Sequence, residues 1–398
     1  MSVAGWTQLR HAVTCLDGRR VPVSAEERSD RQGPYPYWGA NGVVDTIDGY
    51  LFDEPLVLLG EDGAPFFDQA KQVAFCVSGP IWVNNHIHVL RTGSGFDPRF
   101  VTHCLNVTDY GPWIGGTTRD KLTQDDMSCI PVPDLPLSRQ RVIADYLDAE
   151  TARIDGLIAA MRRAADLLDQ RRAALLGVVF TGQHPRFARQ QCRSRPLRSI
   201  ADVALGRARS PENAEGPSMV PYLRAANVKN GQLDLSSVLE MNFSHAEQAR
   251  YALKAGDVLV TEGAGSLAAV GANCLWNGDI DGTVCFQNHL LRIRATDRNH
   301  PGFLQWWARF AYESGLFASI ATGQQILNLG AEHVRALAVG APARSVQVEM
   351  ADFLNYAVGE IEAAKTALVG QTRLLQERRQ ALITAAVTGQ MEIPGVAA

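Results

Sequence analysis

Few side chains of this 398-residue chain are spaced as the groups of a catalytic or metal centre usually are. His86-Ile87-His88 would place two imidazoles on one face of a strand, which can suit a metal ion. No third ligand follows at a convincing spacing, so we favour buried or hydrogen-bonded histidines. Glu262-Gly263-Ala264-Gly265-Ser266 lacks the Lys-Ser/Thr pair of a phosphate-binding loop and is more typical of a turn.

Motifs of methyl transfer and of hydrolysis are also missing from the sequence. It contains no Asn/Asp-Pro-Pro-Tyr/Phe run, no glycine-rich strand-to-helix turn for S-adenosylmethionine and no Gly-x-Ser-x-Gly. The carboxylates are scattered along the chain, and Asp125-Asp126 is typical of a solvated loop. We therefore expect a chain that has no catalytic site of its own.

Base recognition is the chemistry that the polar loops favour. Two short stretches of the second half are rich in such residues: Arg224, Asn227, Lys229 and Asn230, then Gln324, Gln325 and Asn328. Arg, Asn and Gln can bond two atoms of a base edge in the major groove, while Lys and Ser/Thr suit phosphates. Each stretch could equally be ordinary polar surface, and the residues alone leave both interpretations open.

The elements that would position these loops come in two copies. Leu167-Leu168-x-x-Arg171-Arg172, followed by Thr181-Gly182-Gln183, returns 207 residues later as Leu374-Leu375-x-x-Arg378-Arg379, followed by Thr388-Gly389-Gln390. Aligning 138–183 with 345–390 gives 16 identities in 46 positions without a gap, and the same offset places Leu122 on Leu329. A period of this length indicates a duplicated domain rather than a solenoid.

Each copy predicts a long helix with an apolar stripe. Steps of four and three residues from Ile143 reach ten positions, eight of them apolar, and the same count holds from Met350. Stripes sustained over more than four heptads favour the pairing of two helices of about 40 residues, each roughly 60 Å long. Suitable caps bound both helices, with serine before and glycine after: Ser138 and Ser345, Gly182 and Gly389.

The heptad steps place Arg171 and Arg378 at equivalent positions of the helix seam. A charge in an apolar seam is costly unless it is paired. Each arginine would therefore face a carboxylate on the other helix or on a docked subunit, or its head would extend to solvent.

The segments between the helices predict globules of short strands and tight turns. Runs such as 72–77 and 253–260 are rich in β-formers, and Gly, Asn and Asp punctuate them. A helix is expected over 302–319, with Phe303, Trp306, Trp307 and Phe310 on its apolar face. The fold class is α+β, with globules at 1–130 and 184–337, long helices within 131–183 and 338–398, and a pseudo-twofold internal repeat.

Composition limits the class of protein. Hydrophobic residues make up 46% of the chain and charged residues 20%, which excludes a mostly disordered chain. The sequence has no run of about 18 apolar residues, its start lacks the pattern of a signal peptide, and its seven cysteines form no Cys-x-x-Cys pair. We expect a soluble cytoplasmic protein without a disulfide framework.

The sequence resembles the specificity subunits of type I restriction–modification enzymes over essentially its whole length. The resemblance is carried by Gln140-Arg141-Val142-Ile143-Ala144-Asp145-Tyr146-Leu147-Asp148, by Ile154-Asp155-Gly156-Leu157-Ile158 and by the repeated Leu-Leu-x-x-Arg-Arg and Thr-Gly-Gln blocks. Tyr35-Pro36-Tyr37-Trp38-Gly39-Ala40-Asn41-Gly42 is similar to a common opening of a first target-recognition domain.

The resemblance implies a non-catalytic subunit. Its two target-recognition domains would each read one half of a bipartite double-stranded DNA target, and its two antiparallel helices, a coiled coil, would set the spacer. It would dock two modification subunits, which use S-adenosylmethionine to methylate adenine, and two restriction subunits, which use ATP and Mg. No cofactor is expected in this chain. The alternative is a standalone DNA-binding or coiled-coil scaffold protein without a methyltransferase partner.

Base-reading residues of this family vary with the target, so the candidate DNA contacts come from loop chemistry alone. They are Tyr37, Trp38, Asn41, Arg91, Thr118, Arg119, Lys121, Arg224, Asn227, Lys229, Asn230, Gln324, Gln325 and Asn328. The net charge of −4 averages unlike parts: residues 1–130 carry −6 and residues 184–337 carry +3. Such a lightly charged subunit should bind DNA weakly by itself, because phosphate neutralisation supplies most non-specific affinity.

Overall fold

The computed structural model describes residues 5–394 except 69, 116–119, 189–192 and 267–268. The chain divides into two compact units: Met1–Arg163 with Leu368–Ala398 (unit 1), and Ala164–Ala367 (unit 2). Two long helices, α5 (Leu137–Phe180) and α10 (Arg344–Val387), are each shared between the units. Each unit therefore contains one globule and part of both long helices.

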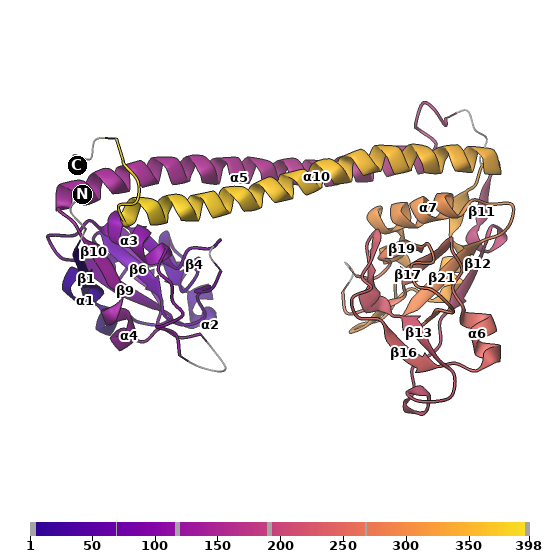
Figure 1. The fold of residues 1–398 in the computed structure, drawn as a ribbon, viewed down its shortest axis with the longest axis horizontal. Coiled ribbons are helices and arrows are strands. Elements are labelled where there is room, and N and C mark those ends of the chain that lie inside the picture. The colour runs from indigo at the N-terminus through magenta and orange to yellow at the C-terminus, as the bar shows by residue number, and fades with distance from the viewer. Residues whose placement is uncertain (1–4, 69, 116–119, 189–192, 267–268, 395–398) are drawn as a thin grey trace. The chain divides into compact units, whose positions relative to one another are not determined.

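The globule of unit 1 rests on two four-stranded sheets, of order β2-β9-β6-β7 and β4-β3-β8-β5. Helix α3 packs on β6 and β7 of the first sheet, and Figure 1 shows α3 beside β6. Its strands are β1 (Gly5–Gln8), β2 (Val13–Cys15), β3 (Tyr35–Gly39), β4 (Gly42–Ile47), β5 (Phe52–Asp53), β6 (Leu56–Gly60), β7 (Ala74–Val77), β8 (Pro80–Val83), β9 (Ile87–Thr92) and β10 (Pro131–Asp134), and its helices are α1 (Leu9–Ala12), α2 (Ala25–Ser29), α3 (Pro98–Asn106) and α4 (Gln124–Cys129).

The globule of unit 2 has sheets of order β12-β21-β17-β19 and β16-β13-β20, and helix α7 packs on β17 and β19. Its strands are β11 (Ser194–Pro196), β12 (Ala201–Leu205), β13 (Met219–Leu223), β14 (Val228–Lys229), β15 (Gln232–Leu233), β16 (Leu239–Asn242), β17 (Asp257–Thr261), β18 (Gly263–Ala264), β19 (Asn273–Trp276), β20 (Cys285–Phe286), β21 (Leu290–Ala295), β22 (Leu327–Asn328) and β23 (Ala338–Gly340), and its helices are α6 (His245–Tyr251), α7 (Pro301–Glu313), α8 (Leu316–Ile320) and α9 (Ala331–Ala336).

The two globules share one topology. In both, an antiparallel sheet carries a helix, and a second sheet contains one parallel pair, β3 with β8 or β13 with β20. A short antiparallel ladder, β1 with β10 or β11 with β23, precedes each long helix in the chain. The internal repeat therefore extends through the globules, although their sequences have diverged.

The central strands are apolar on both faces because each face meets a different core. Along β6, Val57 and Leu59 join the core beneath α3, while Leu56 and Leu58 join a second apolar cluster. This is why a strand of five residues is completely buried and reads as a continuous apolar run. Strand β17 divides its buried residues between two clusters in the same way.

The helix expected over 302–319 is in fact two helices. Helix α7 ends at Glu313 and α8 begins at Leu316, because Gly315 has φ +77° and interrupts the hydrogen bonds of α7. The predicted apolar face is only partly confirmed, since Phe303 and Trp307 are buried, whereas Trp306 and Phe310 are partly exposed.

Both long helices have 44 residues and end as the sequence predicts. Gly182 and Gly389 each have φ +74°, and the next residue donates its amide hydrogen to a carbonyl five residues earlier. The helices begin one residue before the predicted serine caps, at Leu137 and Arg344. The two ends are therefore built alike, apart from this shift at their starts.

Buried glutamines fix the starts of the long helices to the globules. The Gln140 amide oxygen accepts from the Asp97 amide at 2.9 Å, and its nitrogen donates to the Leu135 carbonyl at 2.8 Å. Gln347, 207 residues on, makes the equivalent bonds to the His300 amide and the Pro342 carbonyl, at 2.8 and 2.9 Å. The side-chain amides of Gln140 and Gln347 therefore form internal hydrogen bonds that hold each helix start to its globule.

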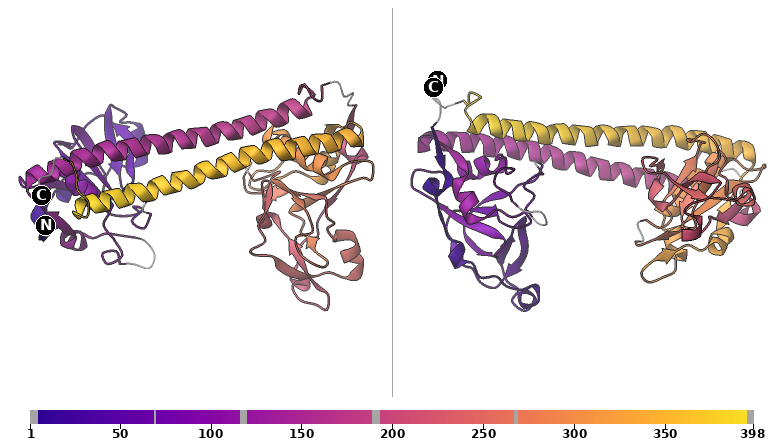
Figure 2. Two further views of the ribbon diagram at one scale, coloured as in Figure 1. Left: turned by 45° about the horizontal axis from the view of Figure 1, so that its top comes forward. Right: turned by 60° about the horizontal axis from the view of Figure 1, so that its bottom comes forward.

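The long helices pair in an antiparallel manner within each unit (Figure 2). In unit 1 Arg379 of α10 lies 3.0 Å from Asp155 of α5, and in unit 2 Arg172 of α5 lies 2.6 Å from Glu362 of α10. These two ion pairs are equivalent under the offset of 207 residues. The antiparallel pairing of the helices and the internal repeat are thereby confirmed.

The placement of Arg171 and Arg378 in the helix seam is wrong. Both side chains are exposed, and their neighbours Arg172 and Arg379 are the arginines that face carboxylates. An α-helix has 3.6 residues per turn, whereas a heptad repeat corresponds to 3.5. A stripe counted by heptads therefore drifts about 20° per heptad away from the buried face. Ile158 is buried instead of Leu157 for the same reason.

Within the described residues, none of the helices is long and apolar enough to cross a membrane.

Candidate nucleic-acid interface

The aromatic candidates of unit 1 hold the core of the second sheet. Tyr37 is only 1% exposed, and its hydroxyl accepts from the Val23 amide at 3.0 Å and donates to the Val23 carbonyl at 3.2 Å. Trp38 is partly buried and packs on Phe75, with the ring centroids 5.4 Å apart. Tyr37 is therefore used inside the protein, and only part of the Trp38 side chain is exposed at the surface.

Arg91 is held by a carboxylate. Its guanidinium donates two hydrogen bonds to Glu54, at 2.6 and 2.7 Å, and these bonds lower the pKa of that carboxyl. Arg294 of unit 2 makes the same two-bond contact with Asp257, at 2.6 Å for each bond. Arg91 and Arg294 follow the equivalent residues Leu90 and Ile293, but their carboxylate partners lie at different positions of the two globules. The charge of Arg91 is thus engaged inside unit 1.

Two candidates of unit 1 lie at the end of β6. Asn41 is exposed, and its amide nitrogen reaches the Gly63 carbonyl at 3.4 Å. Gly63 in turn donates its amide hydrogen to the Asp120 carbonyl at 3.2 Å, beside Lys121, whose side chain is half exposed. The structure thus brings Asn41 and Lys121 to one edge, whereas Thr118 and Arg119 lie outside the described residues.

Asn227 of unit 2 organises a loop from within. It is 1% exposed; its oxygen accepts from the Arg224 amide at 3.0 Å, and its nitrogen donates to the Asp234 carbonyl at 2.8 Å. Arg224 itself is partly buried and reaches Ser237. Asn227 therefore shapes this loop rather than facing solvent.

Lys229 and Asn230 lie at the turn of the β14–β15 hairpin. Lys229 is exposed and Asn230 partly so. The Gly231 amide donates to the Asn273 carbonyl at 2.7 Å, and Asn273 pairs with Val260 near the end of β17. The hairpin is thereby fixed at that end of the sheet.

The third candidate loop of unit 2 follows the same strand. Gln324 and Gln325 are exposed, and Asn328 is partly exposed within β22, which pairs with β18 just after β17. The Leu329 amide donates to the Glu262 carbonyl at 3.0 Å. These residues and the β14–β15 hairpin are therefore attached at one end of the sheet.

Equivalent loops occupy equivalent edges in the two units. In unit 1 the Leu122 amide donates to the Glu61 carbonyl at 2.8 Å, as the Leu329 amide does to Glu262 in unit 2. The sequence offset that aligns Leu122 with Leu329 is thus confirmed by hydrogen bonding. The edge after β6 and the edge after β17 are the surfaces at which the exposed candidates gather.

One cluster in the described chain has the ligand types of a metal site. Side-chain atoms of Asp17, Glu61 and His88 lie within 4.8 Å of one another. Both ring nitrogens of His88 are already engaged, Nδ1 with Asp17 at 2.6 Å and Nε2 with the Leu122 carbonyl at 3.0 Å. Arg20 lies 2.6 Å from Glu61, so these groups do not fit a metal ion.

Sequence patterns gave no signal for this cluster, because Asp17 and Glu61 lie far from His88 along the chain. The strand pairing of β2 and β6 with β9 brings them together. His88 is buried and hydrogen-bonded through both ring nitrogens, which is the environment that the sequence favours for it.

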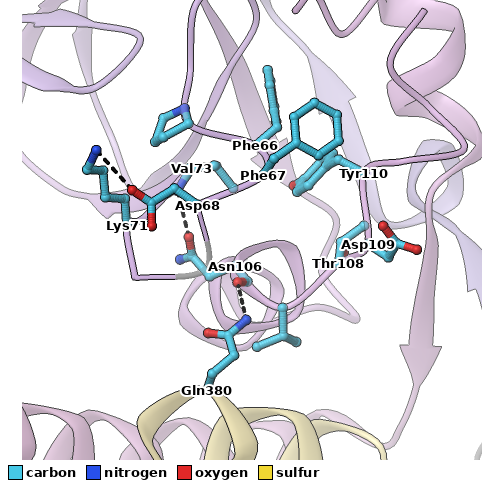
Figure 3. Close-up of a pocket in the computed structure, with 12 residues that line it drawn as sticks. Phe66, Phe67, Asp68, Lys71, Val73, Asn106, Thr108, Asp109, Tyr110 and Gln380 are labelled. Carbon is cyan, nitrogen blue, oxygen red and sulfur yellow. Dashed lines mark hydrogen bonds and ion pairs between the residues drawn. The ribbon is translucent and has the colours of Figure 1, made fainter. Parts of the chain in front are cut away.

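A cavity of about 170 Å³ lies in unit 1, where the globule meets α10 (Figure 3). The Asn106 side-chain oxygen accepts from the backbone amides of Val73 and Ala74. The Asn106 backbone carbonyl accepts from the Gln380 side chain at 3.1 Å. Lys71 pairs with Asp68 at 2.9 Å. These polar groups of the lining are satisfied by one another, so the cavity marks a joint between elements rather than a ligand site.

One part of the chain matches the model of a known protein family. Residues 14–159 match the type I restriction modification DNA specificity domain. A putative type I restriction enzyme specificity subunit of Haemophilus influenzae is 35% identical over 147 residues, and the EcoKI specificity subunit of Escherichia coli is 26% identical over 223 residues. The matches cover 37% and 53% of this chain, and 37% and 47% of those relatives' own lengths.

Comparison with solved structures covers the whole fold. A chain from a study of complex assembly and conformational transition of a type I R-M system matches 98% of this chain and 99% of its own, with a TM-score of 0.73 at 16% identity. The HsdS subunit of Thermoanaerobacter tengcongensis matches 98% of both chains, with a TM-score of 0.52 at 16% identity. The sequence match over residues 14–159 supports the resemblance to specificity subunits, and the solved structures show that the fold is shared over the whole chain.

Proposed function

We propose that this chain, whose resemblance to type I restriction–modification specificity subunits is borne out by sequence and fold, recognises a bipartite DNA target. In this proposal unit 1 reads one half of the target and unit 2 reads the other. The chain itself catalyses nothing and acts in the cytoplasm, where the chromosomal DNA lies. It directs the adenine methylation carried out by partner subunits.

One observation carries the proposal: two globules of a single topology present polar loops at equivalent edges. The exposed side chains are Asn41 and Lys121 after β6, and Lys229, Gln324 and Gln325 near the end of β17. Amide and ammonium groups of this kind serve base edges and phosphates. Because the globules share a fold but differ in these side chains, each would read a different sequence with the same framework.

The helix pair supports the proposed partners and spacer. Equivalent ion pairs, Arg379 with Asp155 and Arg172 with Glu362, repeat across the two long helices. A pseudo-twofold surface suits two copies of one partner. We propose that these copies are modification subunits, which carry S-adenosylmethionine, and that two restriction subunits with ATP and Mg complete the complex.

The charge of the chain is consistent with a subunit that needs partners. The segment 1–130 is acidic at −6, and only the second globular segment is basic, at +3. Binding energy from phosphate neutralisation would therefore come mainly from the modification subunits.

The test is to co-express the full chain with the methyltransferase encoded beside it and to map N6-methyladenine across the host genome. We expect methylation at one split sequence, with two specified half-sites around an unspecified spacer. Binding to DNA without any methylation would support the standalone DNA-binding alternative. Association with protein but with no DNA would support the scaffold alternative.

A further inference from the structure

A buried group of charges in unit 1 has no part in the function proposed above. The His88 cluster comprises Asp17, Arg20, Glu61 and His88. The side chains of Asp17 and His88 are 2% and 1% exposed, and those of Arg20 and Glu61 are 13% exposed. Arg20 lies 3.4 Å from Asp17 and 2.6 Å from Glu61, so its guanidinium joins the two carboxylates.

Donor and acceptor types fix the proton positions in this cluster. A carbonyl oxygen can only accept, so the Nε2 that lies 3.0 Å from the Leu122 carbonyl must carry hydrogen. Asp17 also accepts from the Val89 amide at 2.8 Å and from Gln124 at 2.8 Å, as an ionised carboxylate does. The short contact of 2.6 Å between Asp17 and Nδ1 is the second hydrogen bond of the ring, so both ring nitrogens of His88 have fixed partners inside the fold.

Unit 2 builds the same strand without these charges. The Glu61 and Glu262 amides donate to the carbonyls of His86 and His289 at 2.9 Å each, which makes the two histidines equivalent. Two residues further along, Leu291 takes the place of His88 and is fully buried. A buried ion pair adds little stability over apolar residues, so the sheet alone does not explain the presence of His88.

The cluster does something that a leucine cannot do: it binds the segment Lys121–Gln124. His88 donates to the Leu122 carbonyl, Gln124 donates to Asp17, and Lys121 lies 3.4 Å from Glu61. Both units share the single backbone bond to this segment, from Leu122 or Leu329. Among the described residues of unit 2, the equivalent segment has a different side-chain link, in which the Glu262 carboxylate accepts from the Gly330 amide.

We propose that His88 is a positioning residue for DNA recognition by unit 1, and that its Nε2 bond to Leu122 holds the Lys121–Gln124 segment in the orientation that reads the half-site. This rests on the proposed function. Lys121 is the exposed side chain whose place the segment determines. Unit 2, with Leu291 at this position, reads its half-site without such a link.

The test uses two amide replacements that keep different halves of the imidazole. His88→Gln places a donor near the Nε2 position and keeps the bond to Leu122, whereas His88→Asn places one near Nδ1 and keeps only the bond to Asp17. His86→Gln is the matched control, because His86 lies two residues before His88 in the chain and its side chain is 41% exposed. Each full-length variant is co-expressed with the methyltransferase, and both half-sites are mapped.

We expect His88→Asn to relax discrimination at one half-site by about 10-fold, the equivalent of one lost hydrogen bond. The other half-site should stay unchanged, and His88→Gln and the control should resemble the parent chain. A structural role alone would impair both His88 variants at both half-sites. That result, or unaltered discrimination in His88→Asn, would overturn the proposal.

Hydrogen exchange of the full chain without DNA separates this inference from the proposed function. Amides of peptides covering 120–125 should exchange faster in His88→Asn than in His88→Gln or the control. If the parent chain directs no split-site methylation but this exchange pattern is found, the proposed function fails while the link to the segment stands. Equal exchange in all variants would refute the link itself.

Discussion

Arg172 is a side chain of unit 2 on which three carboxylates converge. Its guanidinium lies within 2.9 Å of Asp169, Glu313 and Glu362, which come from α5, α7 and α10. Arg309 shares Glu313, and Lys365 shares Asp169. Three cations thus balance three carboxylates, and the network joins the globule to both long helices.

Replacing Arg172 should therefore destabilise unit 2. Arg172→Leu leaves Glu313, whose side chain is 9% exposed, with a single cationic partner, and we expect a loss of roughly 3 kcal/mol in unfolding free energy. Urea unfolding followed by circular dichroism measures the loss. Arg171→Leu, at the exposed neighbouring position, is the control and should change stability by less than about 0.5 kcal/mol. Equal losses in the two variants would contradict this account.

Acid stability should depend on Asp17. Burial raises the pKa of this carboxyl, but hydrogen bonds from His88 and Val89 outweigh that effect and lower the pKa from 3.8 to about 2. A carboxyl with a depressed pKa stabilises the fold above its usual pKa, and the contribution disappears as pH falls from about 4 to about 2. The difference corresponds to roughly 2 kcal/mol at neutral pH.

Asp17→Asn should lower Tm at neutral pH and flatten the fall of Tm with acid. Thermal unfolding from neutral pH to about pH 3 measures both effects. Asp53→Asn, at an exposed position of unit 1, serves as the control and should follow the parent curve. A parallel shift of the whole Asp17→Asn curve, with no flattening, would mean that the ionisation of Asp17 is not the cause.

For single residues, the sequence predicted the kind of contact that a side chain makes better than it predicted whether that side chain is buried. The expectation that seam arginines meet carboxylates holds for Arg172 and Arg379, one position away from the predicted ones. Asn227 was selected for an amide that can read bases, yet that amide is buried and caps a loop. Which polar residue of a loop turns inward depends on partners distant in sequence, and these follow only from the fold.

At the scale of elements, the long helices could be predicted because local signals define them. An apolar stripe, a closing glycine and the repeat all act within one segment of chain. The strands were less accessible, since many contain only two to six residues and take their register from partners far away. Insertions also change the offset between equivalent residues, from 207 for Leu122 and Leu329 to 201 for Glu61 and Glu262.

In both units a helix of the globule contacts a long helix at equivalent positions, but the side chains that make the contact differ. His103 of α3 contacts Asp148 of α5 at 2.8 Å, and Trp306 of α7 donates to Asn355 of α10 at 2.9 Å. Asp148 and Asn355 are equivalent under the offset of 207. A histidine–carboxylate contact and a tryptophan–amide contact thus hold the same joint, which indicates that each globule is matched to its own helix position.

The buried glutamines should be essential for attaching the long helices. Gln140→Ala leaves the Asp97 amide and the Leu135 carbonyl without partners, and Gln347→Ala does the same at the His300 amide and Pro342 carbonyl. We expect each change to cost roughly 2–3 kcal/mol, because buried polar groups lose their bonds.

Chemical denaturation checks this prediction, with Gln170→Ala as the control at an exposed helix position. Gln140→Ala should act on unit 1 and Gln347→Ala on unit 2, so limited proteolysis should cut a different globule in each variant. Losses below about 0.5 kcal/mol, comparable to a surface substitution, would show that backbone bonds alone fix the helix starts.

At the scale of the whole molecule, the duplicated plan and the charge asymmetry act together. The first globular segment carries −6 and the second +3, although both share one topology. The affinity of the two globules for DNA would depend differently on salt concentration, because each neutralised phosphate releases counterions. A partner that supplies positive charge would matter most on the side of unit 1.

The helix pair should determine the spacer of the proposed target. Inserting four helix-forming residues after Arg163, at the unit boundary, and four after the equivalent Gly370, close to the boundary in α10, lengthens both helices by about 6 Å. DNA rises about 3.4 Å per base pair, so we expect the methylated site to gain one or two spacer base pairs with unchanged half-site bases. The same insertion after Ala214, in an exposed loop of unit 2, should leave the spacer unaltered. Altered half-site bases with an unchanged spacer would show that the helices do not measure the distance between the half-sites.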